Sequence, residues 1–209
     1  MLELDGIEFG YQRGVPLFRN ISFEVLGGTS FAILGPSGSG KSTLLGLIGG
    51  ALVPTNGATR LDGTARTGES VALNTAWIPQ SLNLLRRRSV LDNATAIARV
   101  DEPQSHWPAI SLRAKATLEE LSMGHLLHAT ARQLSGGEAQ RACIARALVS
   151  KRRLILADEP TGQLDQTMTA AVAEMLTADV PSDRVVVVVT HDRGVARKCD
   201  QIFEFLGAQ

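Results

Sequence analysis

Three short, continuous apolar runs constrain the fold of this chain more than any other feature. Continuous apolar runs, rather than alternating ones, are typical of strands buried on both faces of a parallel sheet. Each run stops at a polar cluster, and open α/β sheets bind ligands beyond the carboxyl ends of their strands. The clusters at 35–43, 158–159 and 190–192 therefore predict one shared site. The runs are Ser30–Leu34, Leu154–Ala157 and Val185–Val189.

The cluster after the first run is a candidate phosphate-binding loop. It fits the pattern G-x-x-x-x-G-K-[ST] between an apolar strand and an apolar helix, which is the context that the pattern requires. Backbone N–H groups can close around phosphates, Lys41 adds a positive charge and the Ser42 hydroxyl can bind Mg²⁺. The alternative is a chance glycine turn; a dinucleotide-binding loop fails, because Thr43 stands where a third small residue is expected. The loop residues are Gly35, Pro36, Ser37, Gly38, Ser39, Gly40, Lys41, Ser42 and Thr43.

Two neighbouring carboxylates, Asp158 and Glu159, follow the second run. Successive side chains of a strand point to opposite faces, so one carboxylate can hold a metal ion while its neighbour reaches an attacking water. By itself, an Asp-Glu pair after a strand is an ordinary loop start. Beside a phosphate loop, the pair predicts a metal-holding Asp158 and a water-polarising Glu159.

His191 follows the five valines of the third run. A lone histidine is more often structural than catalytic, but three converging strand ends favour a functional role for this one. The other histidines are expected on the surface in or near a helical region, because no third ligand accompanies them to form a metal site. They are His106, His125 and His128.

The segment Leu134–Glu138 predicts a helix N-terminus, with Ser135 and Glu138 forming a capping box. A well-capped structural helix is the plain interpretation. However, Gly136 and Gly137 fall in the first turn, where each glycine costs up to about 1 kcal/mol of helix propensity. Bare backbone at a helix N-terminus favours the close approach of an anion.

Alternation of apolar and polar residues over the first 26 positions predicts an antiparallel, half-exposed β layer. Residues 86–133 have no strong strand pattern, and Ala, Leu, Arg and Glu dominate 113–127, which indicates an inserted helical lobe. The predicted fold class is α/β: a P-loop NTPase core with a mixed sheet, an antiparallel β layer and an inserted helical subdomain.

Composition narrows the range of partners. Lys plus Arg and Asp plus Glu both number 21, which argues against nucleic-acid binding. Cys143 and Cys199 are expected to be free thiols. The N-terminus lacks a signal-peptide pattern, and the longest apolar stretch, Leu44–Val53, is far short of the ~20 residues of a membrane span. We therefore expect a cytosolic protein that reaches a membrane only through a partner.

Taken together, the motifs resemble the Walker A, Q-loop, signature, Walker B, D-loop and H-loop of ABC ATPases over nearly the whole chain. The run Glu159–Asp165 is also similar to that of the lipoprotein-releasing, macrolide-exporter and cell-division group, with Gln163 in place of an asparagine. The signature is the most specific part, because other P-loop proteins lack it. In order, the motifs are Gly35–Thr43, Gln80, Leu134–Glu138, Leu154–Glu159, Thr161–Asp165 and His191.

The resemblance implies one ABC ATPase domain over 1–209, with a core at 1–85 and 149–209 and a helical signature subdomain at 86–148. It implies ATP and Mg²⁺ as cofactors, with the metal positioned by Ser42, Gln80 and Asp158. Lys41, Glu159 and His191 would be catalytic. Tyr11 would stack on the adenine, although strand packing is the alternative role for this residue. Across a dimer, the partner's nucleotide would be contacted by Ser135, Gly136, Gly137 and Asp165.

The favoured function is a homodimeric subunit on the inner face of the cell membrane that powers a separate transmembrane permease in export or extraction. A regulatory ATPase whose membrane partner transmits motion without moving a substrate remains open. A soluble ATPase acting on DNA or ribosomes is disfavoured, because no coiled-coil insertion, second cassette or basic excess is present. The permease is expected to dock on Ser81–Arg88, where three leucines adjoin three arginines, although Leu84 and Leu85 could equally belong to the core.

Overall fold

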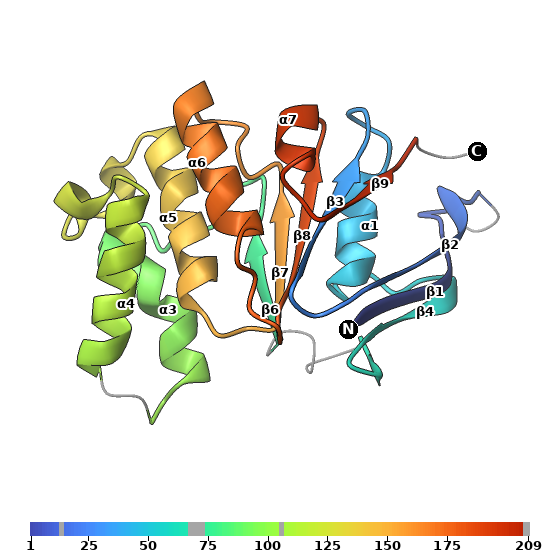
Figure 1. Cartoon of the computed structure of the whole chain (residues 1–209), viewed down its shortest axis with the longest axis horizontal. Coiled ribbons are helices and arrows are strands. Elements are labelled where there is room, and N and C mark those ends of the chain that lie inside the picture. The colour runs from blue at the N-terminus through green and yellow to red at the C-terminus, as the bar shows by residue number, and fades with distance from the viewer. Residues whose placement is uncertain (13–14, 67–73, 105–106, 207–209) are drawn as a thin grey trace.

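The computed structural model describes residues 1–12, 15–66, 74–104 and 107–206, which form two sheets and a group of helices (Figure 1). An antiparallel sheet has the strand order β2-β1-β4-β5. The alternating pattern of the first 26 residues thus corresponds to an antiparallel layer, as predicted. Its strands are β1 (Leu2–Phe9), β2 (Phe18–Val25), β4 (Asn56–Leu61) and β5 (Thr64–Ala65).

The three continuous apolar runs form adjacent strands of the second sheet, which is parallel at every described pairing, in the order β6-β7-β8-β3-β9. Antiparallel and parallel pairing therefore both occur, each in its own sheet. The strands are β6 (Thr75–Ile78), β7 (Leu154–Asp158), β8 (Val185–Thr190), β3 (Thr29–Leu34) and β9 (Gln201–Glu204).

Alternate residues of the buried strands belong to two different hydrophobic cores. Val187 and Val189 pack with helix α1 (Lys41–Ile48) and the antiparallel sheet. Val186 and Val188 pack with the helices on the other face. Since neighbouring side chains point to opposite faces of a sheet, a strand covered on both sides must be apolar throughout.

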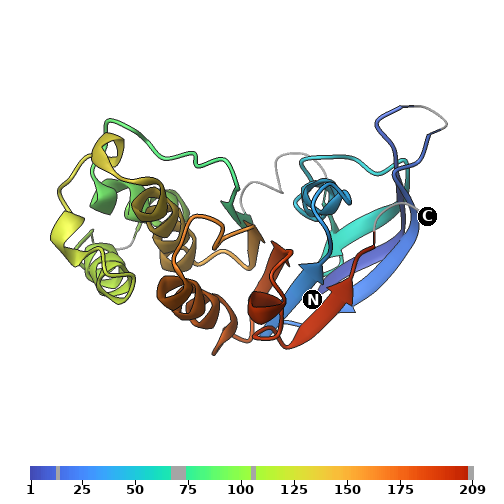
Figure 2. The same ribbon diagram turned by 90° about the horizontal axis from the view of Figure 1, so that it is seen from above.

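The helical lobe and the remaining helices lie on the face opposite α1, and Figure 2 shows this division from above. Among the described residues of 86–148 there are three helices and two short 3-10 turns. None of the helices in the described ranges has the length and apolar composition that crossing a membrane requires. The elements are α3 (Val90–Asp101), α4 (Trp107–Glu120), η1 (Gly124–Leu126), η2 (Ala131–Gln133), α5 (Gly136–Val149), α6 (Gln166–Thr177) and α7 (Arg193–Ala196).

Several predictions for individual side chains can be compared with this fold. Cys143 and Cys199 are buried free thiols, as expected, and burial raises the pKa of both. His125 and His128 are exposed, as expected, whereas His106 lies outside the described residues.

The fully buried side chain of Asn93 holds the turn that leads from Gln80 into α3. Its Oδ1 accepts the backbone N–H of Leu85 at 2.7 Å, and its Nδ2 donates to the carbonyls of Leu85 at 3.2 Å and Ser89 at 2.9 Å. Removing a buried amide that makes three hydrogen bonds lowers the stability of the fold, because backbone groups bonded to the amide lose their partner.

We predict that Asn93→Ala lowers the free energy of unfolding by about 2–3 kcal/mol, measured by urea denaturation. Thr95→Val on the same helix is the matched control. Thr95 is equally buried, but its hydroxyl donates only to helix carbonyls. Those carbonyls keep their helical partners, so the control should cost less than about 1 kcal/mol. Equal losses would contradict the role given to Asn93.

Candidate functional site

The phosphate loop joins the buried strand β3 to helix α1 and already has the shape of an anion cradle. Gly38 and Gly40 have φ angles of 78° and 98°, which residues with a side chain rarely adopt. Gly40 is the N-cap of α1 and supplies no side-chain cap. The first N–H groups of the helix are thus left for a ligand to satisfy.

Lys41 is held within the loop rather than extended into solvent. The residue is only 6% exposed, and its Nζ donates to the carbonyls of Gly35 at 2.8 Å and Pro36 at 2.7 Å. An ammonium group has three protons, and the described residues supply these two acceptors. The lysine therefore places a positive charge beside the bare helix N-terminus.

Asp158, at the end of β7, provides a candidate metal ligand next to the loop. It is buried, its Oδ1 has no hydrogen-bond partner among the described residues, and the Ser42 side chain hydrogen-bonds to its carboxylate. Burial raises the pKa of Asp158, and the charge of Glu159 adds to this; the Ser42 hydrogen bond and the charge of Lys41 act in the opposite direction. An orphaned carboxylate oxygen beside a hydroxyl suits Mg²⁺, which uses one or two protein oxygens together with water and substrate phosphates.

Metal binding by a larger protein cage is not supported by the described residues. They contain no group of three or more His, Cys, Asp or Glu side chains arranged to hold a metal ion. Gln80, the third predicted metal ligand, is exposed just beyond β6 and has no hydrogen bond to Ser42 or Asp158 in the described residues. Its strand pairs with β7, with Ile78 opposite Ala157, so the two strand ends are adjacent.

Glu159 and His191 meet at the ends of β7 and β8. Glu159 Oε1 lies 2.8 Å from His191 Nδ1, and Thr190 Oγ1 donates to Glu159 Oε2 at 3.3 Å. The glutamate side chain is mostly buried, whereas the histidine side chain is 62% exposed. A mostly buried carboxylate beside a solvent-facing histidine at the strand ends is a candidate general base. Thr190 was not singled out from the sequence, although a polar residue that ends a valine run marks this position.

Tyr11 lies beyond the end of β1, and its exposure favours base stacking over strand packing. The side chain is 70% exposed, its hydroxyl is 2.8 Å from Thr43 Oγ1, and its ring packs edge-on against Phe9 with centroids 5.1 Å apart. One edge of the ring is thus fixed near the start of α1 while much of its surface stays available for an aromatic ligand.

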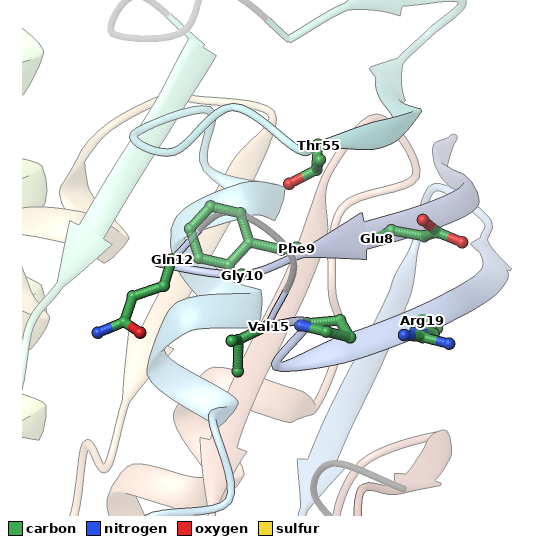
Figure 3. A pocket seen from close by; sticks show the side chains of 8 residues that line it. Glu8, Phe9, Gly10, Gln12, Val15, Arg19 and Thr55 are labelled. Atoms are coloured by element: carbon green, nitrogen blue, oxygen red, sulfur yellow. The ribbon is translucent and has the colours of Figure 1, made fainter.

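A pocket of about 410 Å³ lies beside the loop that carries Tyr11, not at the phosphate loop (Figure 3). No residue of 35–43 lines it, so pocket size does not mark the phosphate site. A hollow of about 170 Å³ does border that site and includes Gly35, Pro36 and His191. The larger pocket is lined by Glu8, Phe9, Gly10, Gln12, Val15, Pro16, Arg19 and Thr55.

The predicted signature forms the exposed N-terminus of α5. Ser135 Oγ accepts the N–H of Glu138 at 3.4 Å, and Glu138 Oε2 accepts the N–H and hydroxyl of Ser135 at 2.8 and 2.7 Å, so the predicted capping box is present. These hydrogen bonds from Ser135 hold the pKa of Glu138 below its usual value. Asp165 caps α6 by accepting the N–H of Met168 at 2.9 Å.

The predicted site residues therefore fall into two groups. Tyr11, the phosphate loop, Asp158, Glu159 and His191 gather around the carboxyl ends of the parallel strands. The N-terminus of α5 belongs to the helical layer on the sheet face opposite α1. A Cβ on Gly136 would overlap the side-chain amide of Gln163, so this N-terminus touches the loop before Asp165.

Comparisons with known proteins agree with this geometry. A family model described as "ABC transporter" matches residues 18–162. The "Lipoprotein-releasing system ATP-binding protein LolD" of Xanthomonas oryzae pv. oryzae is 37% identical over 195 residues, covering 90% of this chain and 80% of that protein. The "Macrolide export ATP-binding/permease protein MacB" of Brucella melitensis biotype 1 is 38% identical over 208 residues, covering 93% of this chain and 31% of that protein. The dimeric post-hydrolysis structure of the ATP-binding cassette MJ0796, bound to ADP and Pi, superimposes with a TM-score of 0.89 at 29% identity, covering 99% of this chain and 94% of that one.

We predict that Glu159→Gln retains ATP binding and lowers turnover by about 10²–10⁴-fold, the usual contribution of a general base. The amide keeps the size and polarity of the side chain but cannot take a proton from water. Steady-state phosphate release measures turnover, and a thermal shift with ATP measures binding. Near-normal turnover would show that Glu159 is not the base.

Proposed function

Since the chain belongs to the ABC transporter family and is an ATPase, we propose that two copies of it bind two MgATP between them and drive a membrane-spanning permease. The names of its relatives support the second half of this proposal. LolD is described as part of a lipoprotein-releasing system, and MacB as an ATP-binding and permease protein for macrolide export. We place this chain on the inner face of the membrane, attached through the permease.

One observation supports the dimer: the phosphate loop and the exposed N-terminus of α5, the two proposed halves of a phosphate site, belong to separate layers of the chain. The phosphate loop precedes α1 on one face of the parallel sheet, and the exposed N-terminus of α5 belongs to the helical layer on the other. A phosphate bound by both would have to come between two copies. Ser135, Gly136 and Gly137 would then complete the partner's site, with Asp165 lining the interface between the copies.

Within each composite site, this chain's residues would act mainly by positioning and by charge. Lys41 and the loop N–H groups hold the phosphates, and Tyr11 supports the adenine. Ser42 and Asp158, with Gln80 directly or through water, would hold Mg²⁺, which would supply charge stabilisation for the transferred phosphoryl group. Glu159 polarises the attacking water. His191 Nδ1 lies 2.8 Å from Glu159 Oε1, which would leave the other ring nitrogen to contact the γ-phosphate.

A mixing experiment tests the composite site. We predict that Lys41→Ala greatly weakens MgATP binding, and that Ser135→Arg abolishes hydrolysis while the monomer still binds ATP. Mixing the two inactive variants should restore up to about a quarter of wild-type turnover. In an equal mixture half of the dimers are mixed, and each of these has one intact site of two. Each variant alone is the control, and loss of ATP binding in the Ser135 variant would contradict the assignment across the dimer.

The segment after Gln80 is the surface that we assign to the permease. Leu82 and Leu84 pack against the core of the helical layer, whereas Leu85 is 51% exposed and precedes the exposed arginines 86–88. An exposed leucine beside positive charges suits a partner helix with an apolar face and acidic residues. Leu82 is thus a poor site for testing docking, and Leu85 is a better one.

We predict that Leu85→Glu weakens co-purification with the permease partner and reduces permease-stimulated turnover at least about tenfold, as expected for an interface hot spot. Basal hydrolysis by the isolated chain should stay within about twofold, since a surface substitution changes stability little. Leu112→Glu, on α4, is the control, because Leu112 is 71% exposed and distant in sequence from this segment. Normal permease binding by the Leu85 variant would show that the permease docks on another surface.

A further inference from the structure

Gln140 of α5 is a buried side chain whose two polar atoms both bind the loop after β7. It is 2% exposed. Its Nε2 donates to the carbonyl of Glu159 at 3.0 Å, and its Oε1 accepts the N–H of Gln163 at 3.0 Å. A buried amide is stable only when its donors and acceptors are matched. This amide therefore fixes both ends of the segment from Glu159 to Gln163.

The residue that Gln140 holds has an unfavourable backbone conformation. Glu159 has a φ of 47°, in the left-handed region that residues other than glycine rarely adopt, at a cost of about 1–2 kcal/mol. Its carbonyl accepts from Gln140 and also from the N–H of Gly162 at 3.2 Å. Such conformations persist only where the surroundings hold them in place. In this backbone conformation, the Glu159 carboxylate contacts both His191 and Thr190.

The same face of α5 carries its exposed N-terminus. Gly136 and Gln140 are four residues apart, so they lie one above the other on one face of the helix. A Cβ at Gly136 would overlap Gln163 Oε1, and the backbone N–H of the same Gln163 donates to Gln140 Oε1. The loop that positions Glu159 is thus packed against the first turn of α5 and hydrogen-bonded to its second.

We propose that Gln140 is a positioning residue that keeps Glu159 in its productive conformation and links it to the first turn of α5. This inference rests on the proposed function, in which Glu159 polarises water and the N-terminus of α5 contacts the partner's nucleotide. Nucleotide bound by the partner copy would contact the N-terminus of α5, and Gln140 would transmit this contact to Glu159 in the same copy as that helix. Gln140 would act on the reaction only through Glu159, because its described hydrogen bonds go to the loop after β7.

The test is Gln140→Met, which keeps the length of the side chain and removes both hydrogen bonds. The expected result is a fall in kcat of about 10–100-fold, comparable to the effect of misplacing a reacting group by about 1 Å. The KM for ATP should be unchanged, because the phosphate loop lies on the opposite sheet face. Gln140→Glu is the second variant. Its carboxylate can accept the Gln163 N–H but cannot donate to the Glu159 carbonyl, so it should lower kcat similarly even if the Met variant folds poorly.

A double substitution distinguishes positioning from general stability. If Gln140 acts through Glu159, then adding Gln140→Met to Glu159→Gln should change the residual single-turnover rate by less than about twofold. Ser150→Ala, at the C-cap of α5, is the control, since the buried Ser150 hydroxyl donates to the Ala147 carbonyl at the other end of the helix from the site. It should leave kcat unchanged while lowering stability.

Three outcomes separate the hypotheses. Normal turnover by Glu159→Gln would refute the role of Glu159 in the proposed function. An impaired Glu159→Gln together with normal kcat in a folded Gln140 variant would overturn the inference alone. A loss in the Gln140 variants that multiplies fully with the loss in Glu159→Gln, or that appears in KM, would also overturn it, because the side chain would then act on the fold as a whole.

Discussion

The parallel register of β3, β7 and β8 is the constraint from which the rest of the site follows. Ile33 lies opposite Val189, and Asp158 also pairs with Val189, so the three strands end at the same level. The residues that follow each strand therefore emerge together, although they are about 30 to 150 positions apart in the sequence. Only a sheet covered on both faces accepts continuous apolar strands, and this covering leaves the strand ends as the place where polar groups can gather.

The helices that cover the two faces of the parallel sheet also determine which parts of the candidate site one copy of the chain brings together. The P-loop helix α1 occupies one face, and its C-terminal carbonyls at Ile48 and Gly49 accept hydrogen bonds from the buried guanidinium of Arg66. Burial lowers the pKa of Arg66, but a positive charge suits the negative end of a helix. The helix is thus anchored at the end away from the phosphates. The opposite face is filled by α5, α6 and α7, so the exposed N-terminus of α5 belongs to a different layer from the phosphate loop.

The sequence was sufficient for the parts of the molecule governed by local pattern. The three buried strands, the antiparallel layer at the N-terminus and the Ser135 capping box follow from periodicity and capping chemistry. Strands β4, β5, β6 and β9 were not predicted. β5 has two residues, β6 has four, and β9 has mostly exposed residues, so none of these three has enough sequence to show a strand pattern. Gln140 and Asn93 are polar residues within helices, where the sequence alone cannot tell an exposed side chain from a buried one. Their partners lie in other segments, and only the fold brings them together.

Helix α5 connects two loops of the candidate site through its side chains. Ala142, Ala145 and Ala147 are fully buried in the core of the helical layer. Between them, Arg146 donates to the backbone and side-chain oxygens of Asn83, and the N–H of Asn83 hydrogen-bonds to Cys143. The segment after Gln80 is thereby fixed to the same helix that holds Glu159 through Gln140. A displacement of α5 would act on both loops at once, since neither hydrogen-bonded group can be left buried and unpaired without a cost of about 1–3 kcal/mol. If a permease docks on Ser81–Arg88 and Glu159 is the base, as proposed, helix α5 would couple the motion of the partner to the position of the base.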